Sequence, residues 1–223
     1  MVPRTLLNLI DKNEYLKVVS DLYISNDFEF YLVGGAVRDG ILDIDTKDFD
    51  FTTNATPEES ISLLNSSGYK TTEIGREFGT IELQIDDNSV HITTYRKDTY
   101  ENSSRNPSIE SAADINTDLS RRDYTINSIA YSIKEDELVD PFLGLKDLAS
   151  GTIRTPDDPI ISFSDDPLRM LRVCRFISTH GCSPDNDTYV AMRDNVERIK
   201  IVSVERIRDE ISKNFKEITE IYF

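Results

Sequence analysis

The chain has 223 residues, of which 38% are hydrophobic and 30% are charged, and its formal net charge is −16. This is the composition of a globular chain long enough for a hydrophobic core, with no apolar run of the roughly 18 residues that a membrane-spanning helix needs and no secretory signal. Its acidity argues against broad coating of nucleic acid. Two cysteines and two histidines are too few for a disulfide framework or a closed zinc site, so we expect a cytoplasmic, reduced protein.

The first predicted elements alternate between helix and strand. Residues 5–20 have the apolar spacing of a helix. Strands are predicted at residues 29–33 and 49–52, and the first of them runs directly into Gly34-Gly35.

A helix and a hairpin are predicted next. Thr56 and Pro57, followed by two acidic residues, are typical of a helix start, and Gly68 is expected to end that helix. Residues 80–95 alternate apolar and polar side chains on both sides of a polar turn at 86–89, which predicts a β-hairpin. Residues 96–118 lack periodicity, and we expect a long loop there.

The last part of the chain is predicted to be helical from Asp165 onward, with Ser203 as the cap of the final helix. Residues 167–223 carry 10 basic and 9 acidic residues, so the net charge of the preceding 166 residues is −17. From the changes in charge and in element type we divide the chain into a first domain, residues 1–150, and a helical second domain, residues 151–223.

Two acidic residues alternate with two aromatic ones in Asp48-Phe49-Asp50-Phe51. Residues two apart on a strand share a face, so the two carboxylates point to one side, about 6.6 Å apart along the strand. Such a pair suits Mg²⁺, which takes oxygen ligands, although a lone pair of this kind is more often two solvated acids on an outer sheet face. A calcium-binding EF-hand starting at Asp43 is excluded, because positions 48 and 54 hold Asp and Asn instead of Gly and Glu.

A glycine turn precedes this strand. Gly34 and Gly35 directly follow a predicted strand, where backbone N–H groups can approach an anion closely, and Arg38 can pair with a phosphate. A Gly-Gly pair alone is usually only a turn. Followed within 17 residues by an arginine and the Asp48–Asp50 pair, it indicates a triphosphate site beside a metal site.

The segment Gly34–Asp39, followed by Asp48-Phe49-Asp50, resembles the first motif of class II tRNA nucleotidyltransferases and bacterial poly(A) polymerases. Both groups belong to the polymerase-β-like nucleotidyltransferase superfamily. The resemblance implies an α+β fold in which a catalytic head, with a mixed sheet and helices, is followed by an all-helical neck that recognises the nucleotide base. One difference is that Leu42-Asp43 stands where the family usually has Leu-Gly.

Later segments resemble further motifs of the same family. Arg121–Tyr131 resembles the second motif, which implies that Arg122 and Asp123 recognise the ribose. Asp140–Leu148 and Ser203–Glu210 resemble a third and a fifth motif, and we expect both to be structural.

The segment Ser164–Phe176 resembles the fourth motif, with Asp165 in place of the family's Glu, and its composition predicts a helix capped by Ser164. By resemblance, Asp166 and Arg169 read the incoming base without a template. A carboxylate accepts from the exocyclic amine of cytosine or adenine, whereas uracil and guanine present a carbonyl oxygen there, and an unpaired polar group costs roughly 1–3 kcal/mol. The resemblance also assigns nucleotide binding to the arginines that recur every three residues after Arg169, namely Arg172 and Arg175.

These motifs together predict a CCA-adding tRNA nucleotidyltransferase, with tRNA 3′ ends, CTP and ATP as substrates and Mg²⁺ held by Asp48 and Asp50 in a two-metal mechanism. Gly79-Thr80 resembles the form found in CCA-adding enzymes, and the loop at 97–120 favours addition of A as well as C. A poly(A) or A-adding polymerase and a non-catalytic nucleotide- or RNA-binding module remain alternatives. His91 stands where many relatives have an acid, and we interpret it as a sheet-surface residue.

The resemblance covers about residues 29–212, whereas family members usually continue with helical body and tail domains that hold the tRNA. Three alternatives stay open: a naturally minimal protein, a fragment of a longer one, or a homo-oligomer or separate partner that replaces these domains. No membrane is expected as a partner.

Overall fold

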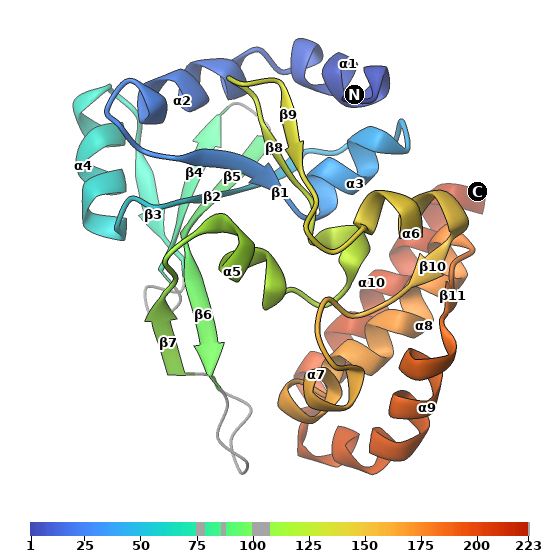
Figure 1. The fold of residues 1–223 in the computed structure, drawn as a ribbon. Helices are drawn as coiled ribbons and strands as arrows, with labels where there is room; N and C mark the ends of the chain where they lie inside the picture. Colours follow the sequence, from blue (N-terminus) through green and yellow to red (C-terminus); the bar gives the residue numbers. More distant parts are fainter. Residues whose placement is uncertain (75–78, 86–87, 100–107, 223) are drawn as a thin grey trace. The chain divides into compact units, whose positions relative to one another are not determined.

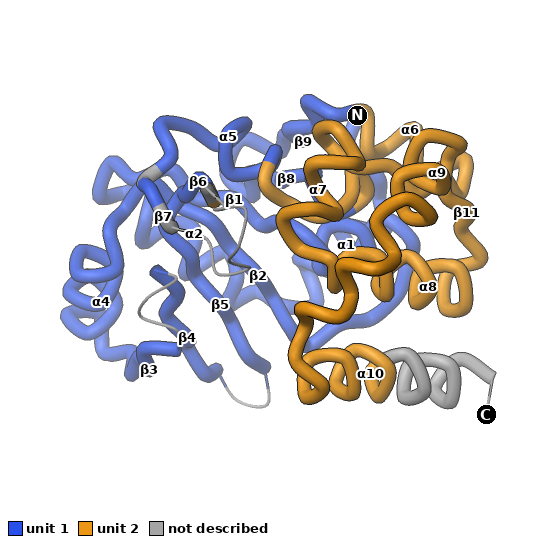
Figure 2. Tube along the Cα trace, turned by 90° about the horizontal axis from the view of Figure 1, so that it is seen from below, with its two compact units in different colours: residues 1–97, 109–120, 127–142 blue, residues 98–108, 121–126, 143–223 orange. Residues whose placement is uncertain are grey.

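The computed structural model describes residues 1–74, 79–85, 88–99 and 108–222. The chain folds into two compact units (Figure 2). Unit 1 consists of residues 1–97, 109–120 and 127–142, and unit 2 consists of residues 98–108, 121–126 and 143–223. The two units are defined by compact packing alone, and the predicted division into domains 1–150 and 151–223 stays a prediction.

Unit 1 is built on a seven-stranded mixed sheet with the order β3-β4-β5-β2-β1-β8-β9 (Figure 1). Strands β2 and β5 run parallel, and the other neighbouring pairs run antiparallel. The expected mixed sheet is therefore confirmed. Its strands are β1 (Phe30–Val33), β2 (Asp48–Thr53), β3 (Thr71–Glu73), β4 (Thr80–Ile85), β5 (Asn88–Thr94), β8 (Ala130–Ser132) and β9 (Glu137–Val139).

The helix predicted over residues 5–20 is two helices, α1 (Arg4–Lys12) and α2 (Tyr15–Ile24). The backbone leaves helical geometry at Asn13, with φ −122° and ψ 62°, and the Asn13 side chain donates to the carbonyl of Leu9. Each helix buries its own apolar side chains, and α1 packs on α3 (Gly35–Ile41) while α2 packs on β1. The break lets one amphipathic segment cover two different surfaces.

Two locally encoded predictions are confirmed. Helix α4 (Pro57–Ser66) begins with a capping box, in which Thr56 Oγ1 accepts from the Glu59 N–H at 3.2 Å and Glu59 Oε2 accepts from the Thr56 N–H at 2.8 Å. Gly68 follows its end at φ +86°. Strands β4 and β5 form the predicted hairpin, whose turn residues 86–87 lie outside the described residues.

The loop predicted over residues 96–118 is wrong at both ends. Strands β6 (Arg96–Thr99) and β7 (Ser108–Ser111) pair as a two-stranded sheet, and α5 (Ile115–Ser120) follows. The spacing of Ile115 and Leu119, both buried in α5, was a helix signal that the polar surroundings obscured. Residues 100–107 lie outside the described residues.

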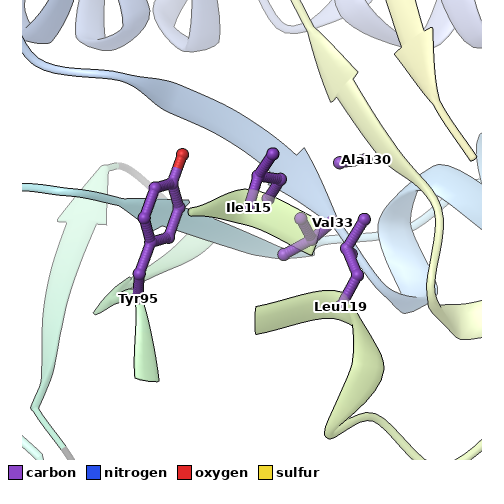
Figure 3. Packing of buried hydrophobic residues seen from close by; sticks show 5 residues of the cluster. All are labelled: Val33, Tyr95, Ile115, Leu119 and Ala130. Carbon is purple, nitrogen blue, oxygen red and sulfur yellow. The ribbon is translucent and has the colours of Figure 1, made fainter. Parts of the chain in front are cut away.

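A buried cluster joins α5 to the sheet (Figure 3). It contains Val33, Tyr95, Ile115, Leu119 and Ala130. Because Val33 is the last residue of β1 and directly precedes the glycine turn, this packing fixes the point at which the turn begins.

Unit 2 is mainly helical, as expected for the neck, with one addition. Its short strands β10 (Thr152–Ile153) and β11 (Ser183–Pro184) form a parallel pair. Helix α8 packs against α10, and α7 packs against α9. The helices are α6 (Gly144–Ser150), α7 (Pro159–Asp165), α8 (Leu168–His180), α9 (Asn186–Asn195) and α10 (Val204–Tyr222), with a 3-10 helix at Val196–Ile201.

The cap predicted for the fourth-motif helix is wrong. Ser164 lies inside α7, and α8 begins only at Leu168. Asp166 is extended, as the residue before a proline tends to be, so Pro167 separates the two helices. The carboxylate of Asp166 instead accepts from the Leu168 N–H at 3.2 Å. Among the helices that the structure describes, none combines the length and the apolar character that a bilayer crossing requires.

Candidate active site

Strand β2 presents Asp48 and Asp50 on its open face and buries Phe49 and Phe51. The Phe51 ring stacks on Phe30 of the neighbouring β1, with centroids 4.5 Å apart and planes 13° apart. Aromatic stacking of this kind adds to the stabilisation from burial. The core side of β2 is therefore firmly anchored, and the two carboxylates are kept on the exposed side.

The neighbouring strand β5 places His91 opposite Asp50 and Ser89 opposite Asp48. His91 Nδ1 lies 3.3 Å from Asp50 Oδ1. This hydrogen bond raises the pKa of His91 above its ordinary value, against the opposing effect of partial burial. The expected position of His91 on the sheet surface is correct, but its contact with Asp50 was not foreseen.

Glu82 on β4 completes this part of the sheet. It lies opposite His91 in the β4–β5 pairing, and its Oε1 is 3.8 Å from His91 Nε2. Ser89 Oγ donates to the same carboxylate oxygen at 2.8 Å and lies 3.3 Å from His91 Nε2. Three neighbouring strands thus contribute to one polar row.

Asp48 and Asp50 fit a magnesium site of a particular kind. Among the described residues, no group of three or more His, Cys, Asp or Glu side chains has an arrangement ready to enclose a metal. Mg²⁺ is commonly held by one or two carboxylates together with water and substrate phosphates. Two exposed carboxylates with hard oxygen atoms on one strand face suit that mode of binding.

The glycine turn places the predicted phosphate-binding residues next to Asp50. Val33, immediately before the turn, is opposite Asp50 in the β1–β2 pairing. Gly34 has φ +70° and ψ −135°, a conformation that side chains with a Cβ rarely adopt. At Gly35, an added Cβ would make only ordinary contacts, at 3.6 Å from Arg38 Nη2.

Arg38 is buried and held on two sides. Its Nε and Nη2 lie 2.8 and 2.7 Å from Asp39 Oδ1, and its Nη1 donates to Asn127 Oδ1 at 2.7 Å. Sequence reasoning gave no role to Asp39 or Asn127, although both lie in the quoted motifs. A phosphate-binding role for Arg38 stays a prediction, and the structure adds that its guanidinium is oriented by these two side chains.

In unit 2, two of the residues predicted to bind the nucleotide contact each other. Asp123 is buried; its Oδ1 accepts from the Tyr124 N–H at 2.9 Å, and its Oδ2 lies 2.9 Å from Arg172 Nη2. Burial lowers the pKa of Arg172, but Asp123 and Glu210 raise it to a net value above the ordinary one. Arg122 precedes this pair and is half-buried.

The predicted base-reading residues lie at the junction of α7 and α8. Arg169 Nη1 donates to Ser162 Oγ, and Nη2 donates to the Arg121 carbonyl, both at 2.6 Å. Asp166 Oδ2 lies 3.5 Å from Nη2 of Arg206 on α10. These contacts restrain both side chains, and the contribution of Arg206 was missed because its segment was interpreted only as structural.

Arg175 occupies a different environment from the other two arginines of α8. It is 9% exposed, and its Nε donates to Glu210 Oε1 at 2.7 Å; Glu210, on α10, is 7% exposed. Each step of three residues turns a helix by about 300°, so Arg175 faces about 120° away from Arg169. Its nucleotide-binding role stays a prediction, whereas the structure places it as a brace between α8 and α10.

Comparison with known proteins gives a consistent family relationship. Residues 30–154 match the family described as "Poly A polymerase head domain", and residues 181–217 match "Probable RNA and SrmB- binding site of polymerase A". A CCA-adding enzyme from Lactobacillus helveticus is 39% identical over 187 residues, which cover 83% of this chain and 46% of that protein. The chain thus spans about half the length of the curated relatives it matches.

Solved structures with a similar fold support the same family relationship. The Bacillus stearothermophilus CCA-adding enzyme in complex with CTP is 31% identical with a TM-score of 0.79, and the match covers 88% of this chain and 46% of that one. A tRNA nucleotidyltransferase complexed with a primer tRNA and an incoming ATP analog is 29% identical with a TM-score of 0.74, covering 92% of this chain and 59% of that one.

Proposed function

Because the chain belongs to the poly A polymerase head-domain family, we propose that it adds C and A from CTP and ATP to the 3′ end of tRNA without a nucleic-acid template. The observation that carries the proposal is the exposed Asp48–Asp50 pair beside the Gly34 turn, through the pairing of Val33 with Asp50. The CCA-adding relatives support CCA addition over poly(A) synthesis.

Asp48 and Asp50 would hold Mg²⁺ through exposed carboxylate oxygens. When bound, Mg²⁺ in a two-metal arrangement supplies charge neutralisation on the triphosphate and a lowered pKa for the RNA 3′-hydroxyl. The backbone of Gly34 and Gly35, together with Arg38, would orient the triphosphate. The 3′-hydroxyl oxygen would attack the α-phosphorus in line and give up its proton to water. A new phosphodiester bond would form as the bond from the α-phosphorus to its bridging oxygen breaks, releasing pyrophosphate.

The residues of unit 2 would select the nucleotide. Arg122 and Asp123 would contact the ribose, where an Asp can accept from the 2′-hydroxyl and so favour ribonucleotides. Asp166 would accept from the exocyclic amine of cytosine or adenine, and Arg169 would donate to the adjacent ring acceptor. Ser162 and the Arg121 carbonyl engage two of the five donors of the Arg169 guanidinium, so orientation and base contact are compatible.

An incorporation assay tests the proposal. The purified chain is incubated with Mg²⁺, radiolabelled CTP or ATP, and a tRNA that ends at the discriminator base. Addition that stops after C-C-A supports the proposal, long A tails indicate a poly(A) polymerase, and no incorporation indicates a non-catalytic binding module.

A matched pair of variants tests the metal ligands in the same assay. Asp48→Asn should abolish incorporation because it removes a charged ligand while preserving shape. Asp43→Asn is the control: Asp43 is an exposed acid at φ +60°, a conformation that Asn tolerates, and the variant should keep wild-type activity. Activity in Asp48→Asn would refute the metal assignment.

A cytoplasmic location, and a homo-oligomer or separate protein partner that helps to hold tRNA, also stay predictions. Native mass spectrometry of the purified chain, with and without tRNA, measures its oligomeric state directly.

A further inference from the structure

A polar row crosses three strands beside the proposed metal ligands. It runs from Asp50 on β2 through His91 on β5 to Glu82 on β4, and Ser89 links the last two. Pairing of the three strands fixes the backbone positions, so these side chains meet without help from a flexible loop. The proposed roles in phosphate, ribose and base binding do not use His91, Ser89 or Glu82.

The hydrogen bonds of the row indicate which nitrogen of His91 carries the proton that faces Asp50. The single Ser89 hydroxyl proton is donated to Glu82 Oε1 at 2.8 Å. The same hydroxyl oxygen also lies 3.3 Å from His91 Nε2. The other ring nitrogen, Nδ1, faces Asp50 Oδ1 at 3.3 Å. A carboxylate oxygen can only accept, so the proton of this contact lies on Nδ1, and both ring nitrogens have a polar neighbour.

Exposure decreases along the row. The side chain of Asp50 is 51% exposed, that of His91 32%, and that of Glu82 25%. The ring is thus anchored at its more covered end and contacts Asp50 at its open end. An isolated surface ion pair has neither the second anchor nor the fixed register, and it contributes little.

We propose that His91 is a positioning residue, which engages Asp50 Oδ1 and leaves Oδ2 directed to the metal, while Ser89 and Glu82 hold the imidazole ring. Groups that hydrogen-bond to metal ligands orient them, and their loss typically lowers metal affinity or activity about 10–100-fold. The inference rests on the proposed function in taking Asp50 as a metal ligand.

Binding of Mn²⁺ alone, measured by the electron paramagnetic resonance signal of the free ion, tests the role without nucleotide or tRNA. His91→Gln places its amide nitrogen near the former Nε2 and removes the donor to Asp50, so we expect the Mn²⁺ dissociation constant to rise about 10-fold. His91→Asn keeps an amide donor near the former Nδ1 and should restore most of the affinity. His180→Gln, at the chain's other histidine, should bind Mn²⁺ like the wild type.

Several results would overturn the inference: unchanged or tighter binding in His91→Gln, equal weakening in both His91 variants, or no Mn²⁺ binding by the wild-type chain. Thermal melting followed by circular dichroism confirms that each variant is folded, and His91→Asn serves as the readout if His91→Gln does not fold. The two hypotheses can fail separately. If the wild type incorporates no nucleotide but His91→Gln binds Mn²⁺ more weakly than the wild type, the proposed function fails and the positioning role stands. If the wild type adds C and A but His91→Gln binds Mn²⁺ as the wild type does, only the positioning role fails.

Discussion

Replacing Arg175 with Met should strongly destabilise unit 2, and we expect this loss of stability to be its main effect. Arg175 and Glu210 are 9% and 7% exposed, and the 2.7 Å contact between them joins α8 to α10. Removing one partner of a buried ion pair leaves an uncompensated charge and typically costs about 3–5 kcal/mol. At roughly 2–4 °C per kcal/mol for a chain of this size, the melting temperature should fall by on the order of 10 °C.

A double-mutant cycle separates the pair from its surroundings. Urea unfolding is measured by circular dichroism for the wild type, Arg175→Met, Glu210→Leu and the double variant. Apolar replacement of both partners removes both charges from the interior, so the double variant should lose clearly less stability than the two single losses added together. Arg193→Met is the control, because the Arg193–Asp194 contact of 2.9 Å is exposed at 65% and 53% and should hardly change the unfolding midpoint.

Binding of CTP and ATP to the same proteins decides between bracing and direct contact. If Arg175 is only a brace, the folded double variant Arg175→Met, Glu210→Leu should bind CTP and ATP with wild-type affinity. Additive losses in the cycle, or an Arg175→Met protein with wild-type stability and weakened nucleotide binding, would refute the brace and support a nucleotide ligand.

Three further predictions concern unit 1. Gly34→Ala should cost about 1–3 kcal/mol in urea unfolding because of the Gly34 backbone conformation, whereas Gly35→Ala should be tolerated; equal losses would contradict this. Thr56→Ala removes half of the capping box and should cost about 1 kcal/mol, and an unchanged urea midpoint would contradict the cap's contribution. In metal-free chain, Asp50 raises the pKa of His91, so this pair stabilises the fold fully below about pH 6.5 and loses its effect as the pH rises through the folded-state pKa. Asp50→Asn should lower that pKa in an NMR titration, and an unchanged value would exclude Asp50 as the cause.

The elements predicted correctly are those whose signals are local. The helix start at Thr56 and the alternation in residues 80–95 need only neighbouring residues, and both are present in the structure. The break at Asn13 and the helix α5 are different, because each depends on which surface the segment packs against. Apolar spacing shows that a segment is amphipathic, but it does not show that the segment must cover two surfaces.

The candidate site divides in the same way. The common face of Asp48 and Asp50 follows from the two-residue period of one strand, so the sequence was sufficient to predict it. The contact between Asp50 and His91 depends on the parallel pairing of strands 41 residues apart, and that register comes from tertiary packing. The same holds for Arg175 and Glu210, where helix pairing decides the partner.

Under the proposed function, the three arginines of α8 would let one motif both read a base and hold the base-reading side chains in place. Discrimination between an amine and a carbonyl oxygen requires that the protein's donor and acceptor cannot rotate to suit the wrong base. Arg169 is oriented by Ser162 and the Arg121 carbonyl, and Asp166 is held by the start of α8. Arg175 in turn fixes α8 on α10 through Glu210. Under the proposed function, the motif therefore needs arginines beyond those that touch the base, because a protein that replaces a template must itself supply the stiffness that base pairing would provide.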